Sequence, residues 1–261
     1  MKRFLALVSL MIACSGAIAQ DSVAPDSWAG LGKLLFKDAV IADDAIFVSL
    51  DAPPRAEDAA LTPVTLAIHA PAGDPRRVVK ISLVIDENPV PLAGEFTLGP
   101  KADVTTISTR VRVNAYTFIH AVALLSDGSL HATKAYVKAA GGCSAPATKD
   151  MDEAEIGKLK LRVIGDARPG RADYVVMMRH PNNSGLQMDQ VTRLYTPARY
   201  VDHLAIYQGD DLVFAVEGGI SISEDPNFRF DFARTEAKTL RVEAHDIDNT
   251  KFQASWPIPG V

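Results

Sequence analysis

The sequence predicts an all-β protein made of two immunoglobulin-like β-sandwiches, and three observations lead to this class. Seventeen Gly and sixteen Pro residues are spread through the 261 residues and divide the chain into short segments, as in proteins built of strands and turns. These segments fall into two series, each about as long as an ordinary domain. With 48% hydrophobic and 23% charged residues, the chain can bury a core without disulfides or metals.

The first series of predicted strands occupies residues 33–138. Its segments are rich in apolar residues and end at turn residues, for example at Asp86-Glu87-Asn88-Pro89. Ser126-Asp127-Gly128-Ser129 predicts a hairpin, because Gly128 can adopt a positive φ. The seven expected strands cover residues 45–50, 64–69, 78–85, 95–98, 104–111, 116–125 and 130–137.

The second series of predicted strands occupies residues 156–261, after a linker of different composition at residues 139–155. The linker begins with small residues and continues into the charged run 149–155, without helical or strand periodicity. Gln208-Gly209-Asp210-Asp211 predicts a hairpin within the second series. The seven expected strands cover residues 159–164, 173–178, 203–207, 212–216, 228–232, 240–244 and 252–256.

The beginning of the chain has the pattern of a secretory signal peptide at residues 1–19. Lys2-Arg3 is followed by an apolar run and by Ala17-Ile18-Ala19. The run is too short to span a bilayer, so we expect an exported protein, periplasmic in a bacterium, with no membrane span. Lipidation of Cys14 is the less favoured alternative, because Met11 stands where lipoprotein signals usually carry Leu. The net charge of −5 argues against nucleic acid as a partner.

Removal of the signal peptide would leave Cys143 as the only cysteine, although cysteines of exported proteins normally occur in pairs. No large apolar residue lies near it in residues 139–147, so we expect an exposed thiol on a mobile arm, with an ordinary pKa. Gly141 and Gly142 would form the arm, since glycine restricts the backbone little and adds no bulk.

Two parts of the chain resemble known sulfur-oxidation proteins. Gly141-Gly142-Cys143, at the end of the first β series, resembles the Gly-Gly-Cys-Gly-Gly arm of SoxY, the periplasmic sulfur carrier. The segment 178–186, with His180-Pro181, resembles the signature loop of SoxZ, the partner of SoxY, and Ser221–Pro226 continues this likeness. The order of the halves resembles the fused SoxYZ-like carriers associated with quinoprotein dehydrogenases.

This resemblance implies a carrier that is not an enzyme, with two docked halves and no cofactor. Cys143 would hold a sulfur-containing intermediate of the thiosulfate or sulfane type and present it to sulfur-oxidation or dehydrogenase-associated partner enzymes. Two features depart from the family pattern: Ser144-Ala145-Pro146 replaces the second Gly pair, and the arm is tethered at both ends. We therefore expect either a partner site open enough for two strands of chain or proteolytic cutting within residues 146–155.

Other interpretations of the sequence lead to different functions. Met177, Met178, His180 and Met188 lie close together, and thioether and imidazole ligands suit Cu(I), so the alternative is a binding module that delivers a ligand or copper to a quinoprotein dehydrogenase. Packing of these methionines in the core is the favoured interpretation, and no metal site or catalytic residue is predicted. A third possibility is an intermolecular disulfide through Cys143. The remaining histidines, His69, His120, His131, His203 and His245, are scattered and are expected to be structural or solvated.

Overall fold

The computed structural model describes residues 27–146, 151–164 and 169–258. The first half contains α1 (Trp28–Phe36), β1 (Ile41–Asp43), β2 (Val48–Asp51), β3 (Thr62–Ile68), β4 (Val78–Ile85), β5 (Leu92–Leu98), β6 (Thr106–Val111), β7 (Thr117–Leu125) and β8 (Leu130–Val137). The second half contains the 3-10 helix η1 (Glu153–Glu155), β9 (Leu159–Val163), β10 (Arg171–Met178), β11 (Val201–Gln208), β12 (Asp211–Gly218), β13 (Asn227–Ala233), β14 (Thr239–Asp246) and β15 (Lys251–Pro257).

The all-β prediction is confirmed, and all fourteen expected strands are present. Two of them, β4 and β8, have the predicted bounds, and the others differ by a few residues at their ends. The hairpin turns are also as expected, with Gly128 at φ 87° and Gly209 at φ 61°. The sequence analysis missed β1, which has only three residues, and α1, which contains Gly30 and Gly32 and whose N-cap residue Ser27 makes no side-chain capping bond.

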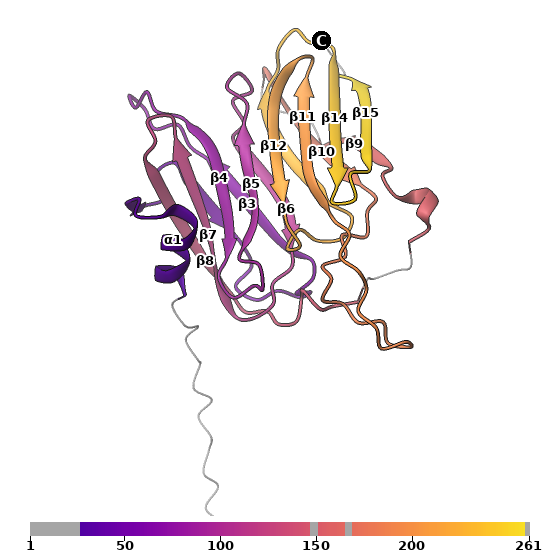
Figure 1. Ribbon diagram of the computed structural model, residues 1–261. Coiled ribbons are helices and arrows are strands. Elements are labelled where there is room, and N and C mark those ends of the chain that lie inside the picture. Colours follow the sequence, from indigo (N-terminus) through magenta and orange to yellow (C-terminus); the bar gives the residue numbers. More distant parts are fainter. Residues whose placement is uncertain (1–26, 147–150, 165–168, 259–261) are drawn as a thin grey trace, which may run out of the picture.

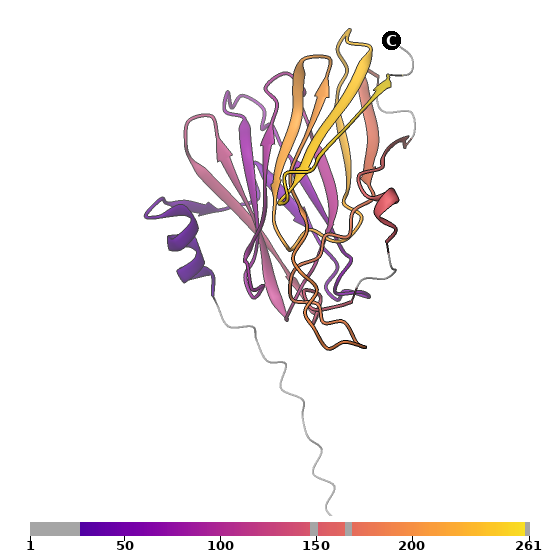
Figure 2. The same ribbon diagram turned by 45° about the vertical axis from the view of Figure 1, so that its right-hand side comes forward.

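The two halves share their sheets. One sheet has nine strands in the order β1-β8-β7-β4-β5-β12-β11-β14-β15, and the other has six in the order β2-β3-β6-β13-β10-β9. Strand β5 pairs antiparallel with β12, and β6 pairs antiparallel with β13. In both views the magenta strands of the first half lie beside the orange strands of the second (Figure 1 and Figure 2). Backbone hydrogen bonds therefore join the halves, in addition to the side-chain docking that the sequence led us to expect.

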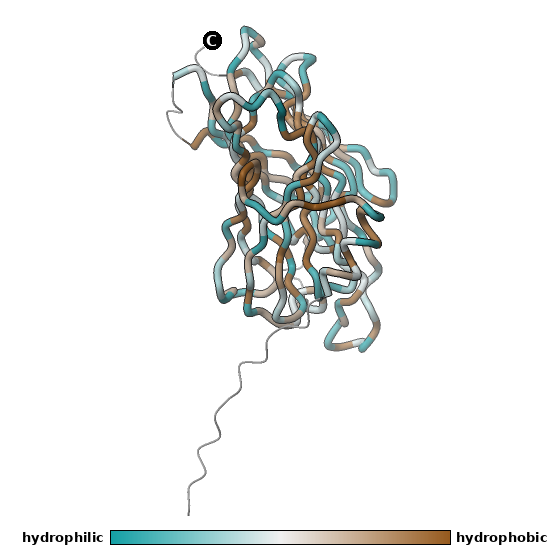
Figure 3. Tube along the Cα trace, turned by 90° about the vertical axis from the view of Figure 1, so that its left-hand side faces the viewer, coloured by the Kyte–Doolittle hydropathy of each residue, from teal (hydrophilic) through white to brown (hydrophobic). Residues whose placement is uncertain are grey.

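A single hydrophobic core fills the space between the two sheets and runs through both halves. Strand β10 shows strict alternation of buried and half-buried residues, as expected for a strand with one face on a core, and Figure 3 shows apolar and polar segments interleaved along the chain trace. Phe96 of the first half meets Phe228 of the second edge-on, with ring centroids 6.3 Å apart. Phe214 and Phe230 extend this aromatic packing with centroids 5.2 Å apart.

Helix α1 covers part of the outer face of the nine-stranded sheet (Figure 1). The ring of Trp28 stacks on His120 of β7 with centroids 3.8 Å apart and planes 9° apart. Beneath the tryptophan, His120 Nδ1 is hydrogen-bonded to Asp86 at 3.0 Å, and both residues are buried. Strands β4 and β7 are buried along most of their length, whereas β10 and β14 alternate between buried and less buried residues.

The predicted signal peptide, residues 1–19, lies outside the described residues. In the three described ranges, no helix is long and apolar enough to cross a membrane.

Cutting the chain between residues 146 and 155 should leave the two halves associated. The pairs β5–β12 and β6–β13 and the shared core all lie outside the cut, so both sheets stay continuous. The test is to insert a protease site there and compare cut and uncut protein by size-exclusion chromatography at micromolar concentration. Co-elution of the two fragments is expected, and separate elution would contradict the shared-sheet architecture.

Candidate functional site

Cys143 is completely buried, with 0% of its surface exposed, and it is a free cysteine. The prediction of an exposed thiol on a mobile arm is therefore wrong for this conformation. Residues 139–146 follow β8 as an ordered segment, whose Gly142–Ser144 turn lies against the first half. An intermolecular disulfide through Cys143 would also require this segment to move first, because a sulfur without exposed surface cannot reach another chain.

The two glycines before Cys143 allow the segment to lie against the protein instead of forming a swinging arm. The amide of Gly141 donates to the carbonyl of Asn114 at 2.8 Å, and that of Gly142 donates to Val113 at 3.0 Å. A Cβ atom on Gly142 would lie 2.1 Å from the carbonyl oxygen of Ala59, so only glycine fits there. Gly141 has a φ of 78°, which favours glycine. The same residues that predicted mobility are thus needed for close backbone packing.

A buried arginine connects the cysteine segment to the second half. Arg112 follows β6 and is only 1% exposed. Its guanidinium donates to the carbonyl oxygens of Gly142 and Asn182, both at 3.3 Å. Burial lowers the pKa of Arg112, and the charges of Glu224 and Asp58 oppose that shift. Because a buried cation is costly unless its donors are satisfied, the closed segment and the arginine depend on each other.

The loop after β10 closes over the cysteine from the second half. The hydroxyl of Ser184 donates to the carbonyl oxygen of Cys143 at 2.5 Å. The side-chain oxygen of Gln187 accepts from the amide of Ser184 at 2.9 Å and so fixes this loop. Both residues are buried. A loop of the second half therefore fastens the cysteine segment directly, and nothing in the spacing of the sequence indicated that contact.

Burial raises the pKa of the Cys143 thiol to about 11, although the positive charge of Arg112 acts in the opposite direction. At pH 7 only about one thiol in ten thousand would be ionised at such a pKa. The thiolate is the nucleophilic form of cysteine. The closed conformation therefore holds the thiol in an unreactive, protonated form, in contrast to the ordinary pKa expected of an exposed arm.

A pocket of about 430 Å³ lies beside the cysteine segment. Its lining comes from the segment itself at Pro146 and from the second half at Met151, Pro181, Gln187 and Arg199. Gln187 also binds Ser184, which holds Cys143. The pocket therefore lies beside the segment that carries the buried thiol, although Cys143 itself does not line it.

His180, the residue of the predicted signature loop, is buried and already bonded through both ring nitrogens. Nδ1 lies 3.1 Å from the amide of Asn182, and Nε2 lies 3.5 Å from the carboxylate of Asp246. Burial lowers the pKa of His180 and so favours the neutral ring. Both nitrogens of the imidazole in the suggested Met/His copper site are therefore used in hydrogen bonds that hold the loop. Met178 packs in the core, as the favoured interpretation of the sequence expected.

Histidines that are scattered in the sequence come together with acidic residues in the fold. His131 lies 2.9 Å from Asp44, and His69 is bonded to Ser49. His203 and His245, 42 positions apart in the chain, stack on each other with ring centroids 5.1 Å apart. Within the described ranges, no three or more His, Cys, Asp and Glu side chains converge as a preformed metal cage.

Comparison with known proteins identifies both halves. Residues 33–143 match the family "Sulfur oxidation protein SoxY", and residues 164–257 match "Sulphur oxidation protein SoxZ". The SoxY match ends at Cys143. The chain thus carries a SoxY domain followed by a SoxZ domain in one polypeptide.

Among curated proteins, nothing matches this chain. Solved structures with a similar trace include the sulfur carrier protein SoxY from Chlorobium limicola f thiosulfatophilum, at 21% identity over 44% of this chain and 92% of that chain, with a TM-score of 0.35. Another is a superoxide reductase (neelaredoxin) from Ignicoccus hospitalis, at 12% identity over 35% of this chain and 79% of that chain, with a TM-score of 0.31.

Ser184→Ala should make Cys143 more reactive without unfolding the protein. The substitution removes the hydroxyl bond to the carbonyl of Cys143, worth about 1 kcal/mol, so the segment should open about fivefold more often. The measurement is the rate at which an aromatic disulfide reagent modifies the native protein. Ser82→Ala is the matched control, because Ser82 is also buried and donates a side-chain hydrogen bond to the carboxylate of Glu95, and its bond does not involve the cysteine segment. Equal acceleration in both variants would contradict a specific role for Ser184.

Alkylation of Cys143 in the native protein should keep accelerating with pH up to about 11. The folded state holds the thiol proton until the pKa of about 11, whereas an unfolded cysteine loses it near pH 8.5. Between these values the unfolded state binds fewer protons, so the closed state loses stability as pH rises. Iodoacetamide rates would be compared for folded protein and for protein in urea. A folded-state rate that levels off near pH 8.5 would refute burial of the thiol.

Proposed function

We propose that this chain is a periplasmic carrier that holds a sulfur-containing intermediate on Cys143 and presents it to partner enzymes, without catalysing a reaction itself. The observation that carries the proposal is the position of Cys143, which follows Gly141-Gly142 and ends the SoxY domain. The SoxZ domain in the same chain supports it, since the two domains share both sheets. Joining partners in one chain keeps their effective concentration high even after partial opening.

Loading would form a disulfide-type bond at the thiol. With thiosulfate as cargo, Cys143 Sγ bonds to the outer sulfur of thiosulfate, the thiol releases one proton, and two electrons pass to an electron-accepting redox protein. The product is a cysteine S-thiosulfonate with one negative charge. Hydrolysis of its terminal sulfonate by a partner enzyme would add water, release sulfate and one proton, and leave a protonated persulfide on Cys143.

The buried conformation is proposed to be the resting state of the carrier. A thiosulfonate cannot be accommodated on a sulfur with 0% exposure, so the segment must open for loading. Opening breaks two backbone hydrogen bonds, from Gly141 to Asn114 and from Gly142 to Val113. It also breaks the side-chain hydrogen bonds that Arg112 and Ser184 donate to the segment. At roughly 0.5–1.5 kcal/mol for each net hydrogen bond, four bonds hold the segment closed by on the order of 2–6 kcal/mol.

The resting state would protect the single thiol from oxidation and disulfide exchange in an oxidising compartment. A buried, protonated cysteine resists oxidation and disulfide exchange, because both reactions need an accessible thiolate. In the open state the adjacent pocket beside Pro146 and Gln187 offers space for the carried group. Arg199 on its wall is ion-paired with Glu153 at 3.1 Å. The partners proposed are sulfur-oxidation enzymes or enzymes associated with a quinoprotein dehydrogenase.

Mass spectrometry of the protein isolated from its own cells under non-reducing conditions tests this function. A mass increase confined to the peptide that contains Cys143, and removed by reductant, is expected during growth that uses the pathway. The same measurement gives the mature N-terminus, which tests export, and shows whether residues 146–155 are cut. The mass of the adduct identifies the cargo.

Cys143→Ser provides the matched control for the carrier function. The hydroxyl has nearly the same size as the thiol and should leave the fold intact, as a far-UV circular dichroism spectrum can verify. We expect no adduct on the variant and complete loss of the pathway activity that depends on this protein. Retained activity in cells that contain only the folded variant would refute the carrier proposal.

A further inference from the structure

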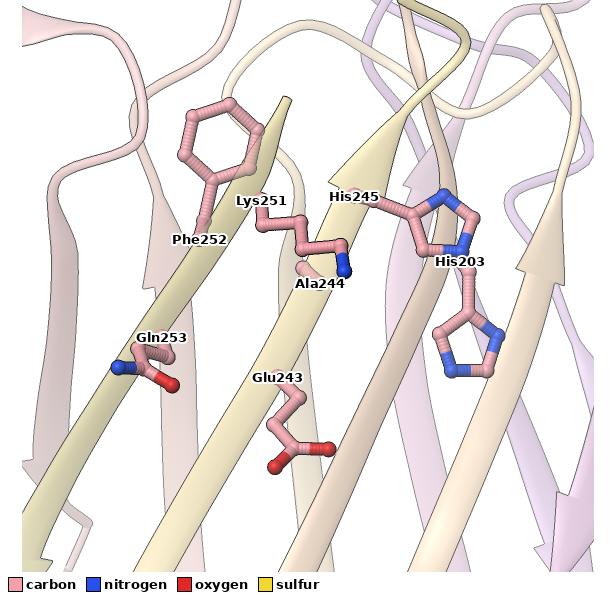
Figure 4. Close-up of a pocket in the computed structure, with 7 residues that line it drawn as sticks. All are labelled: His203, Glu243, Ala244, His245, Lys251, Phe252 and Gln253. Atoms are coloured by element: carbon pink, nitrogen blue, oxygen red, sulfur yellow. The ribbon is translucent and has the colours of Figure 1, made fainter. Parts of the chain in front are cut away.

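Two histidines face each other on the outer surface of the nine-stranded sheet. His203 of β11 and His245 of β14 are directly opposed in the antiparallel register, and their ring planes are 16° apart. Opposed residues of neighbouring strands have Cβ atoms about 4.5–5.5 Å apart, and the ring centroids lie 5.1 Å apart, so the two imidazoles are direct neighbours. Figure 4 shows both rings in the pocket formed on this surface.

Each of the two rings is oriented by a carboxylate. Nδ1 of His203 lies 2.7 Å from Glu217 of β12, and Nδ1 of His245 lies 2.7 Å from Asp202. A carboxylate only accepts hydrogen bonds, so each Nδ1 carries the proton and each Nε2 of a neutral ring presents its lone pair. Within the described residues, no hydrogen bond engages either Nε2. A carboxylate that holds one ring nitrogen while the other faces outward is the usual outer shell of a metal-bound histidine.

A β-bulge in β11 makes this arrangement possible. The register between β11 and β14 shifts between Val201 and His203, so Asp202 is the extra residue on its strand. Without the bulge, Asp202 and His203 would point to opposite faces of the sheet. The bulge instead brings the Asp202 carboxylate to the ring of His245. The ring of His203 still stacks on that of His245. Bulges commonly redirect a side chain next to a functional site.

The surroundings of the two rings favour a cation. The pocket has a volume of about 580 Å³ and is also lined by Glu243, Lys251 and Gln253 (Figure 4). The two orienting carboxylates give two negative charges near the rings against the positive charge of Lys251, while Glu243 is ion-paired with Arg241. The side chains of His203 and His245 are 29% and 39% exposed, so an ion can reach them from solvent.

We propose that His203 and His245 form a binding site for a first-row divalent transition metal, with Cu(II) bound most tightly. Imidazole nitrogens suit Cu, Zn and Ni, and Cu(II) heads the affinity order for such ligands. Two protein ligands leave the remaining coordination positions to water or to a further molecule, so the site is exchangeable. It is separate from the carrier site, since its pocket shares no lining residue with the pocket beside Cys143.

Titration of the full-length mature protein with Cu(II) tests the site. Untagged protein carrying Cys143→Ser would be used, so that the thiol cannot act as a ligand. Calorimetry should give one equivalent of bound Cu(II), and electron paramagnetic resonance should show coupling to two imidazole nitrogens. His203→Ala and His245→Ala should each weaken binding at least about tenfold, and Asp202→Asn, which removes only the orienting carboxylate, about tenfold.

His69→Ala is the control variant, because His69 is an exposed histidine bonded to Ser49, and within the described residues no other ring stacks on it. It should bind Cu(II) like the parent protein. Circular dichroism and the melting temperature of each variant establish that the fold is kept. The proposal is overturned if the double variant His203→Ala/His245→Ala binds as tightly as the parent, or if the parent shows no binding with two-nitrogen coupling.

Discussion

Backbone pairing between the two halves is the constraint on which the rest of the structure depends. Because β5 continues into β12 and β6 into β13, the SoxY and SoxZ domains have a fixed relative position and share a core. That position brings the loop at Asn182–Gln187 over the end of the SoxY domain. Cys143 is buried where these two parts meet, so the exposure of this residue of one domain depends on contacts from the other.

The polar contacts at this junction account for the behaviour that we infer for the thiol. Arg112 reaches the carbonyls of both the cysteine segment and the second-half loop, and Ser184 binds the carbonyl of Cys143. These bonds involve the backbone of the segment and not the sulfur, so they can form and break without any chemical change at the thiol. A fused chain suits a segment that opens and closes in this way, because opening the segment need not separate the two halves. The tether at both ends of the arm then limits how far the cysteine can travel.

Most of the fold could be predicted from the sequence, whereas the site could be predicted only in part. Apolar segments between turn residues indicated every long strand, because strand and turn signals are local. The burial of Cys143 could not be foreseen, because the residues that hold its segment are distant in the chain. Arg112 lies 30 positions before Gly142, and Ser184 lies 41 positions after Cys143. Small residues around it indicated mobility, but close backbone packing requires small residues too. The pairing of His203 with His245 likewise depends on strand order and on a bulge, which no local pattern reveals.

Hydrogen exchange measured on loaded and unloaded protein tests the central claim, that cargo and the buried resting state exclude each other. Tetrathionate would convert the thiolate of Cys143 into the S-thiosulfonate with release of thiosulfate, and exchange would be followed in the peptide covering residues 139–146. We predict slow exchange before loading and fast exchange afterwards, with the β5–β12 peptides unchanged. Equally slow exchange in fully loaded protein would show that the cargo fits the closed state and would contradict this account.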